Sequence, residues 1–202
     1  VYEQEGFLVS FKLYASTSVQ PTGYKFPEFE GFVVQEVELP QEKSWVRENY
    51  NGKNYNTVLL KQSVLYPQRT GNITIGAGSY DMIMRIPSQR KVKSIFDDFF
   101  DSYQDVKKTI TTSPTTIQVK ALPSGKPASY SGGVGSFKLA SSINTNNLKT
   151  NEALTIKLTI SGNGNLRLVK NPTVVFPDDF EVYDPKVTND IRTTASGMSG
   201  TK

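Results

Sequence analysis

"EGFLVSFKLYAS" at residues 5–16 and "NEALTIKLTISG" at residues 151–162 share one alternation of apolar and polar residues. The apolar positions are 7, 9, 11 and 13 in the first stretch and 154, 156, 158 and 160 in the second. A period of two residues is typical of a β-strand with one face buried and the other in water. Both stretches therefore predict half-buried strands.

A second motif follows each of these strands. "KFPEFEGFVV" stands at residues 25–34 and "VFPDDFEVYD" at residues 175–184, with Phe26 and Phe176 before the proline. The order strand, loop, Phe-Pro motif, strand thus occurs twice, and a repeated unit indicates duplicated domains. We expect two tandem sandwiches, residues 1–121 and residues 122–202, in which Phe26 and Phe176 occupy equivalent core positions.

The remaining pattern predicts an all-β fold. Asn51-Gly52 is the strongest short hairpin signal in the chain. Residues 121–135 contain two prolines and four glycines and predict a linker, and Gly162–Gly164 predict a tight turn. Many short strands with turn residues between them are typical of a β-sandwich.

The ends of the two predicted units do not match. Only 22 residues follow Phe180, so we expect the second sandwich to be incomplete at its C-terminus. Residues 133–150 have no counterpart before Glu5, so we also expect a first strand to be missing at the N-terminal end. The chain begins at Val1 rather than Met, which favours an excised or processed piece of a longer protein.

One segment has a helical pattern. Residues 92–108, "VKSIFDDFFDSYQDVKK", place aromatic residues at helical spacing with aspartates between them. We expect a short helix between about residues 93 and 104, inside a long connection between strands, with at least one phenylalanine ring exposed. Its aromatic side chains either pack on their own sandwich or dock a partner, and Phe96, Phe99 and Phe100 are the candidate partner-binding residues.

Composition excludes several classes of function. The chain has no cysteine, which rules out disulfides and thiolate chemistry, and no histidine, the commonest general base and metal ligand. The net charge of +4 lacks the clustered basic footprint of nucleic-acid binding. No catalytic motif, cofactor motif or metal-ligand spacing is present, so we expect no enzyme, no cofactor and no metal.

An ordered series of segments carries a family resemblance. The series is "YEQEGFLVSFKLY", "FPEFEGFVV", "NGKNYNTVLLKQSVLYPQRTGNITI", "SPTTIQVKALPSGKP", "GGVGSFKLASSI" and "ISGNGNLRLVKNPTVVFPDDFEVYDPK". It resembles the BatD (oxygen-tolerance, aerotolerance) proteins of Gram-negative bacteria from Tyr2 to about Lys186. The resemblance implies immunoglobulin-like modules that face the periplasm, in a protein held to the inner membrane by a C-terminal helix. It also implies partners of the von Willebrand-A and TPR types.

The leading hypothesis is therefore a non-enzymatic periplasmic scaffold that binds other envelope proteins. The full-length protein is expected to be membrane-anchored and this fragment to be soluble. A carbohydrate-binding or adhesive module is the alternative, because sugar sites use exposed aromatic platforms. Trp45 exposed beside Tyr50 and Tyr55 would favour sugar binding, whereas a buried Trp45 would favour the scaffold.

Overall fold

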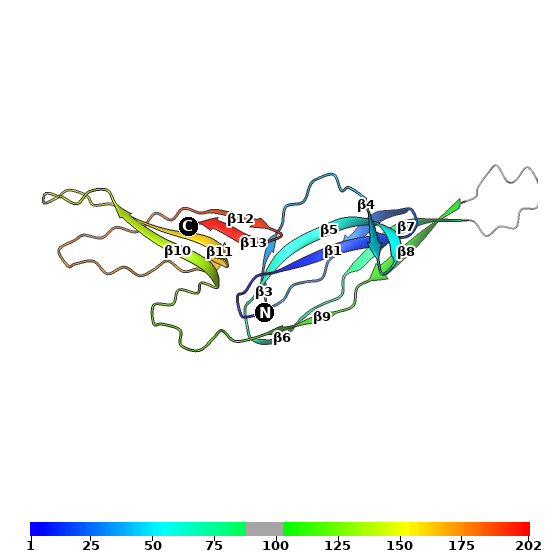
Figure 1. Cartoon of the computed structure of the whole chain (residues 1–202), viewed down its shortest axis with the longest axis horizontal. Coiled ribbons are helices and arrows are strands. Elements are labelled where there is room, and N and C mark those ends of the chain that lie inside the picture. The colour runs from blue at the N-terminus through cyan, green and yellow to red at the C-terminus, as the bar shows by residue number, and fades with distance from the viewer. Residues whose placement is uncertain (88–102) are drawn as a thin grey trace, which may run out of the picture.

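The computed structural model describes residues 1–87 and 103–202, and Figure 1 shows how their strands are arranged. The described residues form β-strands and one short 3₁₀ helix, η2 (Leu166–Leu168). Their several sheets do not close into a barrel and are consistent with β-sandwich modules. The predicted all-β class is confirmed.

The first sheet is built around one long strand. Its members are β1 (Phe7–Ala15), β3 (Phe32–Glu36), β4 (Val46–Tyr50) and β5 (Lys53–Pro67). β5 pairs with β1 along one edge and with β3 and β4 along the other. β1 is therefore an edge strand of this sheet in the described part of the chain.

Two smaller sheets face it. One has the order β2-β7-β8 and the other joins β6 to β9. The ranges are β2 (Val19–Lys25), β6 (Gly71–Ile75), β7 (Ser79–Pro87), β8 (Tyr103–Thr111) and β9 (Thr115–Val119). All these pairings are antiparallel, as expected for strands that bury one face and leave the other in water.

The core of this half lies between these sheets. Its buried residues are Leu13, Val58, Leu60, Tyr80 and Met82. The ring of Phe26 packs against it, with its centroid 5.1 Å from the ring of Phe11 and 5.8 Å from that of Tyr80. The predicted core role of Phe26 is confirmed.

The C-terminal part forms a separate four-stranded sheet at the other end of an elongated molecule (Figure 1). Its order is β10-β11-β13-β12, with ranges β10 (Gly135–Ile143), β11 (Ile156–Gly164), β12 (Asp190–Thr194) and β13 (Gly197–Thr201). No sheet of the described residues mixes strands from the two sides of the predicted boundary at 121/122. The boundary itself stays a prediction.

A second apolar cluster joins the two parts. Val64 and Tyr66 of β5 pack with Leu166 and Met198, and all four side chains are at most 1% exposed. Beside this cluster, the fully buried Asn165 donates to the side-chain oxygen of Gln4 at 3.0 Å and to the carbonyl of Gly132 at 2.8 Å. We call this region the joint.

The predicted hairpin at Asn51-Gly52 is confirmed. Tyr50 pairs with Lys53, so the loop between β4 and β5 has two residues. Asn51 and Gly52 both have left-handed φ values, 51° and 77°. Two such residues match the right-handed twist of the flanking strands, which is why Asn-Gly favours this turn.

The helical interpretation of residues 92–108 is wrong where the structure describes it. From Tyr103 onward the chain forms β8, and nine residues pair with β7 up to Thr111. Val106 and Ile110 are β-branched, and this long ladder satisfies the backbone better than one helical turn. Residues 88–102, with Phe96, Phe99 and Phe100, lie outside the described residues.

The predicted turn at Gly162–Gly164 is also wrong. These residues lie inside β11, where Gly162 pairs with Phe137 and Gly164 with Gly135. A Cβ at Gly162 would stand 2.1 Å from the carbonyl oxygen of Ser136. Glycine is needed here because β10 approaches closely, rather than because the chain turns.

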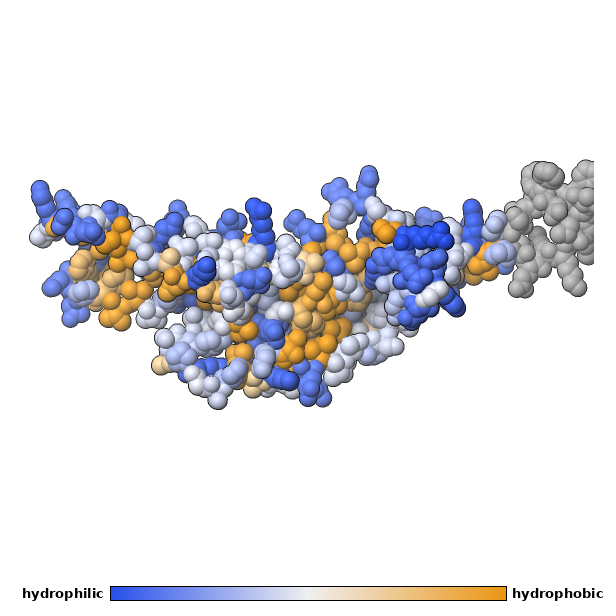
Figure 2. Space-filling model, viewed as in Figure 1, coloured by the Kyte–Doolittle hydropathy of each residue, from blue (hydrophilic) through white to orange (hydrophobic). Residues whose placement is uncertain are grey.

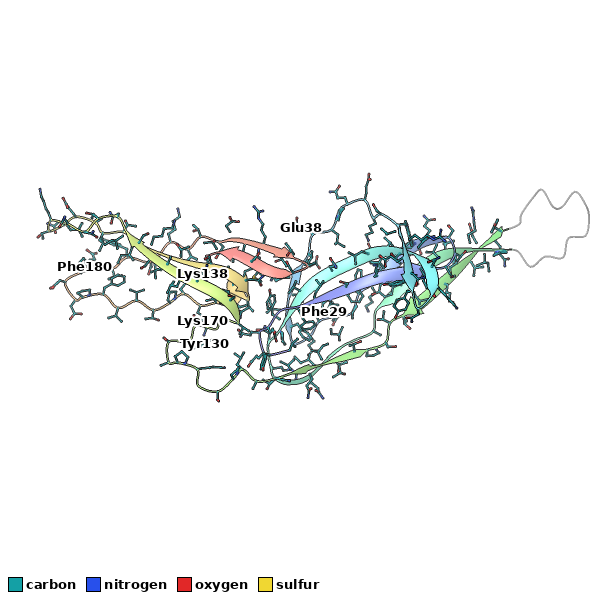
Figure 3. The ribbon with its side chains drawn as sticks, viewed as in Figure 1. Phe29, Glu38, Tyr130, Lys138, Lys170 and Phe180 are labelled. Carbon is teal, nitrogen blue, oxygen red and sulfur yellow. The ribbon has the colours of Figure 1, made fainter. Side chains whose placement is uncertain are left out.

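The second Phe-Pro motif does not repeat the first. Phe26 is followed by β3, but no described strand lies between η2 and β12, so the strand predicted after Phe176 is absent. β3 pairs with β5, whereas residues 180–184 pair with no strand that the structure describes. Phe176 is half-buried, and Phe180 lies in a loop far from the first sheet (Figure 3).

The last residues of the chain, 188–202, are mostly polar or small, yet they contain two paired strands. β12 and β13 pair from Asp190↔Thr201 to Thr194↔Gly197, and β13 also pairs with β11. Met198 in β13 is fully buried in the joint. The tail therefore contributes to the core.

Candidate functional site: a tyrosine face on the first sheet

The pairing register places several large side chains on one outer face. Tyr14 of β1 and Val46 of β4 both pair with Thr57 of β5. Directly paired residues, and residues two apart on one strand, point to the same side of a sheet. Tyr50 and Tyr55 therefore lie on this side too. We call the surface formed by Tyr14, Val46, Tyr50 and Tyr55 the tyrosine face.

The ring of Tyr14 contacts the rings of both other tyrosines. Tyr14 lies 5.2 Å from Tyr50 at an interplanar angle of 48°, and 6.0 Å from Tyr55 at 83°. Tyr50 remains 54% exposed, Val46 53% and Tyr14 40%. The face thus presents apolar carbon and phenolic hydroxyls to solvent from rings whose positions support each other.

An ion pair borders the tyrosine face. Lys12 Nζ donates to both carboxylate oxygens of Glu48, at 2.5 and 2.7 Å, and stands 5.7 Å from the centre of the Tyr14 ring. The hydrogen bond from Lys12 lowers the pKa of Glu48, and the same bond raises the pKa of Lys12. The two charges neutralise each other, so this side of the face has a polar rim with little net charge.

Trp45 lies immediately before β4. It is 43% exposed, so the scaffold criterion of a buried Trp45 is not met. In the part of the chain that the structure describes, no ring contact joins it to Tyr50 or Tyr55. The criterion for sugar binding is met only in part, because Trp45 is exposed but its ring is not in contact with the two tyrosines. Tyr14 contacts both of them instead. Sequence reasoning missed Tyr14, because only the pairing of β1 with β5 brings it to the tyrosines of the hairpin.

A groove runs along β1 at the edge of the same sheet. It has a volume of about 460 Å³ and is lined by Phe7–Leu13 of β1 and by residues of β8, β9 and the loop between them. Tyr80 also lines it, and the Tyr80 hydroxyl is buried with no hydrogen-bond partner among the described residues. Burial raises the pKa of this phenol. In the space-filling view, orange side chains gather between β1 and the β6–β9 ribbon (Figure 2).

The structure does not test the candidate partner-binding residues that the sequence suggested. Phe96, Phe99 and Phe100 lie outside the described residues, so their position relative to the tyrosine face stays open.

Residues 1–87 and 103–202 hold no group of three or more acidic side chains that could bind a metal ion. Within those ranges there is also no helix of the length and hydropathy that crossing a membrane requires.

Comparison with known families bears on the C-terminal sheet. Residues 141–202, from the end of β10 through β13, match the family model described as BatD DUF11 like domain. This match over the C-terminal third of the chain supports a fragment of a BatD-family protein. The BatD family is extracytoplasmic and is not a known enzyme family. No curated protein and no solved structure matches the chain significantly.

Proposed function

We propose that this BatD fragment is a non-enzymatic protein-interaction module on the periplasmic face of the inner membrane, and that its tyrosine face contacts another envelope protein. The observation that carries the proposal is the cluster of Tyr14, Tyr50 and Tyr55, exposed on a sheet and bordered by the Lys12–Glu48 ion pair. Protein interfaces combine such aromatic centres with polar rims, and tyrosine is enriched among their energetic hot spots.

The chemistry of the tyrosine face indicates which kind of partner surface would fit it. Phenolic hydroxyls donate and accept hydrogen bonds, and the neighbouring ion pair is internally neutral. The partner surface should therefore be apolar at its centre, with hydrogen-bonding groups around it and no dense charge. We expect it on an extracytoplasmic protein of the same membrane complex, with von Willebrand-A and TPR proteins as the first candidates from the family resemblance.

Site-specific photocrosslinking in the membrane-anchored protein tests this proposal. A benzophenone amino acid at Tyr50 should give a discrete adduct, whereas the same group at Tyr183, which is 77% exposed, should not. With the purified partner, Tyr50→Ala should weaken binding about tenfold, which corresponds to about 1.4 kcal/mol. Tyr183→Ala should leave affinity unchanged. No adduct at Tyr50, or equal adducts at both sites, would contradict the proposal.

Carbohydrate binding is the second candidate, favoured by the exposure of Trp45 and Tyr50. A sugar ring stacks best on a flat aromatic surface, but the rings of the tyrosine face are tilted by 48° and 83°. Trp45 is the one tryptophan in the chain, so its fluorescence reports on this region alone. Titration with peptidoglycan fragments should leave that fluorescence unchanged, and a saturable shift would favour the sugar hypothesis.

A further inference from the structure

Strand β10 is an edge strand with a free backbone side. It ends the order β10-β11-β13-β12, so no described strand pairs with its outer side. On the far edge of β11, the N–H of Ile160 donates to the carbonyl of Lys202 at 2.9 Å, and the carbonyl of Ile160 accepts the Lys202 N–H at 2.8 Å. Ile160 thus sends no backbone bond to Leu139, its partner in β10. The N–H and C=O of Leu139 therefore point away from β11, to the free edge.

The same orientation recurs at every second residue of β10. Hydrogen-bonded and non-hydrogen-bonded pairs alternate along an antiparallel ladder, and the nine pairs of β10 with β11 run without a register shift. The odd-numbered residues from 135 to 143 therefore present their backbone groups outward, whereas the even-numbered residues bond β11. In agreement, the N–H of Asn144 donates to the carbonyl of Thr155 at 3.2 Å. A row of unpaired groups of this kind binds a further extended chain.

Other edge strands of the described residues carry features that discourage such binding, and β10 lacks them. The pairing of β1 with β5 contains a bulge, β2 contains Pro21, and β8 has three charged residues among nine. Bulges, prolines and charges are the usual means by which an edge strand avoids pairing with another chain. β10 has one charged residue, Lys138, and no proline, and its Leu139 side chain is 66% exposed. β10 is therefore an edge suited to association.

A second copy of β10 fits this edge. Leu139 is the middle residue of the strand, so an antiparallel register centred on it pairs all nine residues of both copies. Each outward N–H then meets an outward carbonyl, because odd-numbered residues face odd-numbered residues. Lys138 faces Ala140 of the second copy, so the one charge of the strand does not oppose itself. A register centred on Lys138 would place the two ammonium groups opposite each other and is disfavoured.

We propose that two copies of this chain associate through β10, antiparallel and about a twofold axis at Leu139. The contact joins the two four-stranded sheets into one continuous sheet and places the exposed Leu139 side chains next to each other. Phe137 then lies opposite the small Ser141 of the second copy. Ile143 likewise lies opposite Gly135, so neither large side chain meets another. Twofold dimers in which one surface meets itself are the commonest homo-oligomers. The tyrosine face lies on the first sheet, so this contact is independent of the proposed function.

Sedimentation of chain 1–202 tests the dimer with a matched pair of variants. Ser141→Pro removes one outward N–H but leaves the bonds to β11, because Ser141 directs its N–H to the free edge. Ser141→Ala keeps that N–H. The unchanged chain and Ser141→Ala should form dimers as the concentration rises, whereas Ser141→Pro should weaken dimerisation at least about tenfold. A monomer at every concentration, or equal dimerisation of both variants, would overturn the proposal.

Hydrogen exchange locates the contact without any substitution. In the dimer, the amides of Phe137, Leu139 and Ser141 should exchange at least about tenfold more slowly than in a dilute, monomeric sample, because they gain carbonyl partners. The amides of Lys138 and Ala140 already bond β11, so their exchange rates should change much less. A dimer without slower exchange at the odd-numbered residues would assign association to another surface and refute the proposal.

Cross-linking identifies the register, because the chain contains no natural cysteine. With Leu139→Cys, a short thiol-reactive cross-linker should join two copies, since the substituted residues face each other at the axis. With Ser142→Cys, the two thiols stand about 20 Å apart along the ladder at about 3.3 Å per residue, and the same reagent should give no covalent dimer. Cross-linking at residue 142 but not at residue 139 would contradict the proposed axis.

Discussion

At Gly162 the absence of a side chain allows β10 and β11 to approach closely enough to pair. Its φ of 153° and its distance to β10 both exclude a side chain, because a Cβ would lie 2.1 Å from the Ser136 carbonyl oxygen and 2.9 Å from Phe137 Cα. The close approach lets nine residue pairs form between β10 and β11 without a break. The glycine is therefore part of the sheet.

Gly162→Ala should destabilise the protein by at least about 2 kcal/mol, since the new methyl group forces β10 away or strains the backbone. Gly76→Ala is the matched control, because nothing lies within 4 Å of a Cβ there and its φ is not left-handed. Urea unfolding measures both, and Gly76→Ala should stay within about 0.5 kcal/mol. Equal losses would show that the approach of β10 is not limiting.

Among the elements, the β4–β5 hairpin positions the tyrosine face. The two-residue turn sets the register Tyr50↔Lys53 and Glu48↔Tyr55, and that register brings Tyr50 and Tyr55 to the same side as Tyr14. A slip of one residue would turn the side chains of one strand to the opposite face. The arrangement of the tyrosine face therefore depends on the two-residue turn at Asn51-Gly52.

Gly52→Val should weaken this coupling, because a β-branched residue is strained at a φ of 77°. We expect a loss of about 1–2 kcal/mol in unfolding free energy and a smaller near-ultraviolet circular dichroism signal from the tyrosines. Asn56→Val, at an exposed residue of β5 whose side chain points away from the tyrosine face, serves as the control and should change neither quantity appreciably. A normal tyrosine signal in Gly52→Val would show that the register does not depend on this turn.

At the scale of the whole molecule, the joint links the two halves through both apolar contact and hydrogen bonds. The Asn165 side chain bonds Gln4 and Gly132 and also accepts the Val134 N–H at 2.7 Å, while Tyr66 packs with Leu166 and Met198. Buried polar groups that are fully satisfied in this way fix the relative position of the segments that they connect.

Asn165→Ala should cost about 2–3 kcal/mol, because it leaves partly buried backbone groups of Val134 and Gly132 without their hydrogen-bond partner. We also expect calorimetry to resolve two unfolding transitions in place of one, as the C-terminal sheet loses its attachment to β5. Asn163→Ala, an exposed neighbour in β11, should keep the single transition. A single, equally shifted transition in both variants would argue against coupling through the joint.

The sequence by itself determined the all-β class, the strand at residues 7–13, the Asn51-Gly52 hairpin and the core role of Phe26. These features follow from local alternation and turn chemistry, which act over a few residues. Only the tertiary structure placed Gly162 inside a strand, assigned residues 103–111 to β8 and left the segment after Phe176 without a partner. Strand formation there depends on whether another strand offers an edge, and no local pattern encodes that. The tyrosine face and the joint also depend on the tertiary structure, because the side chains that form each of them meet only when segments distant in the sequence pack together.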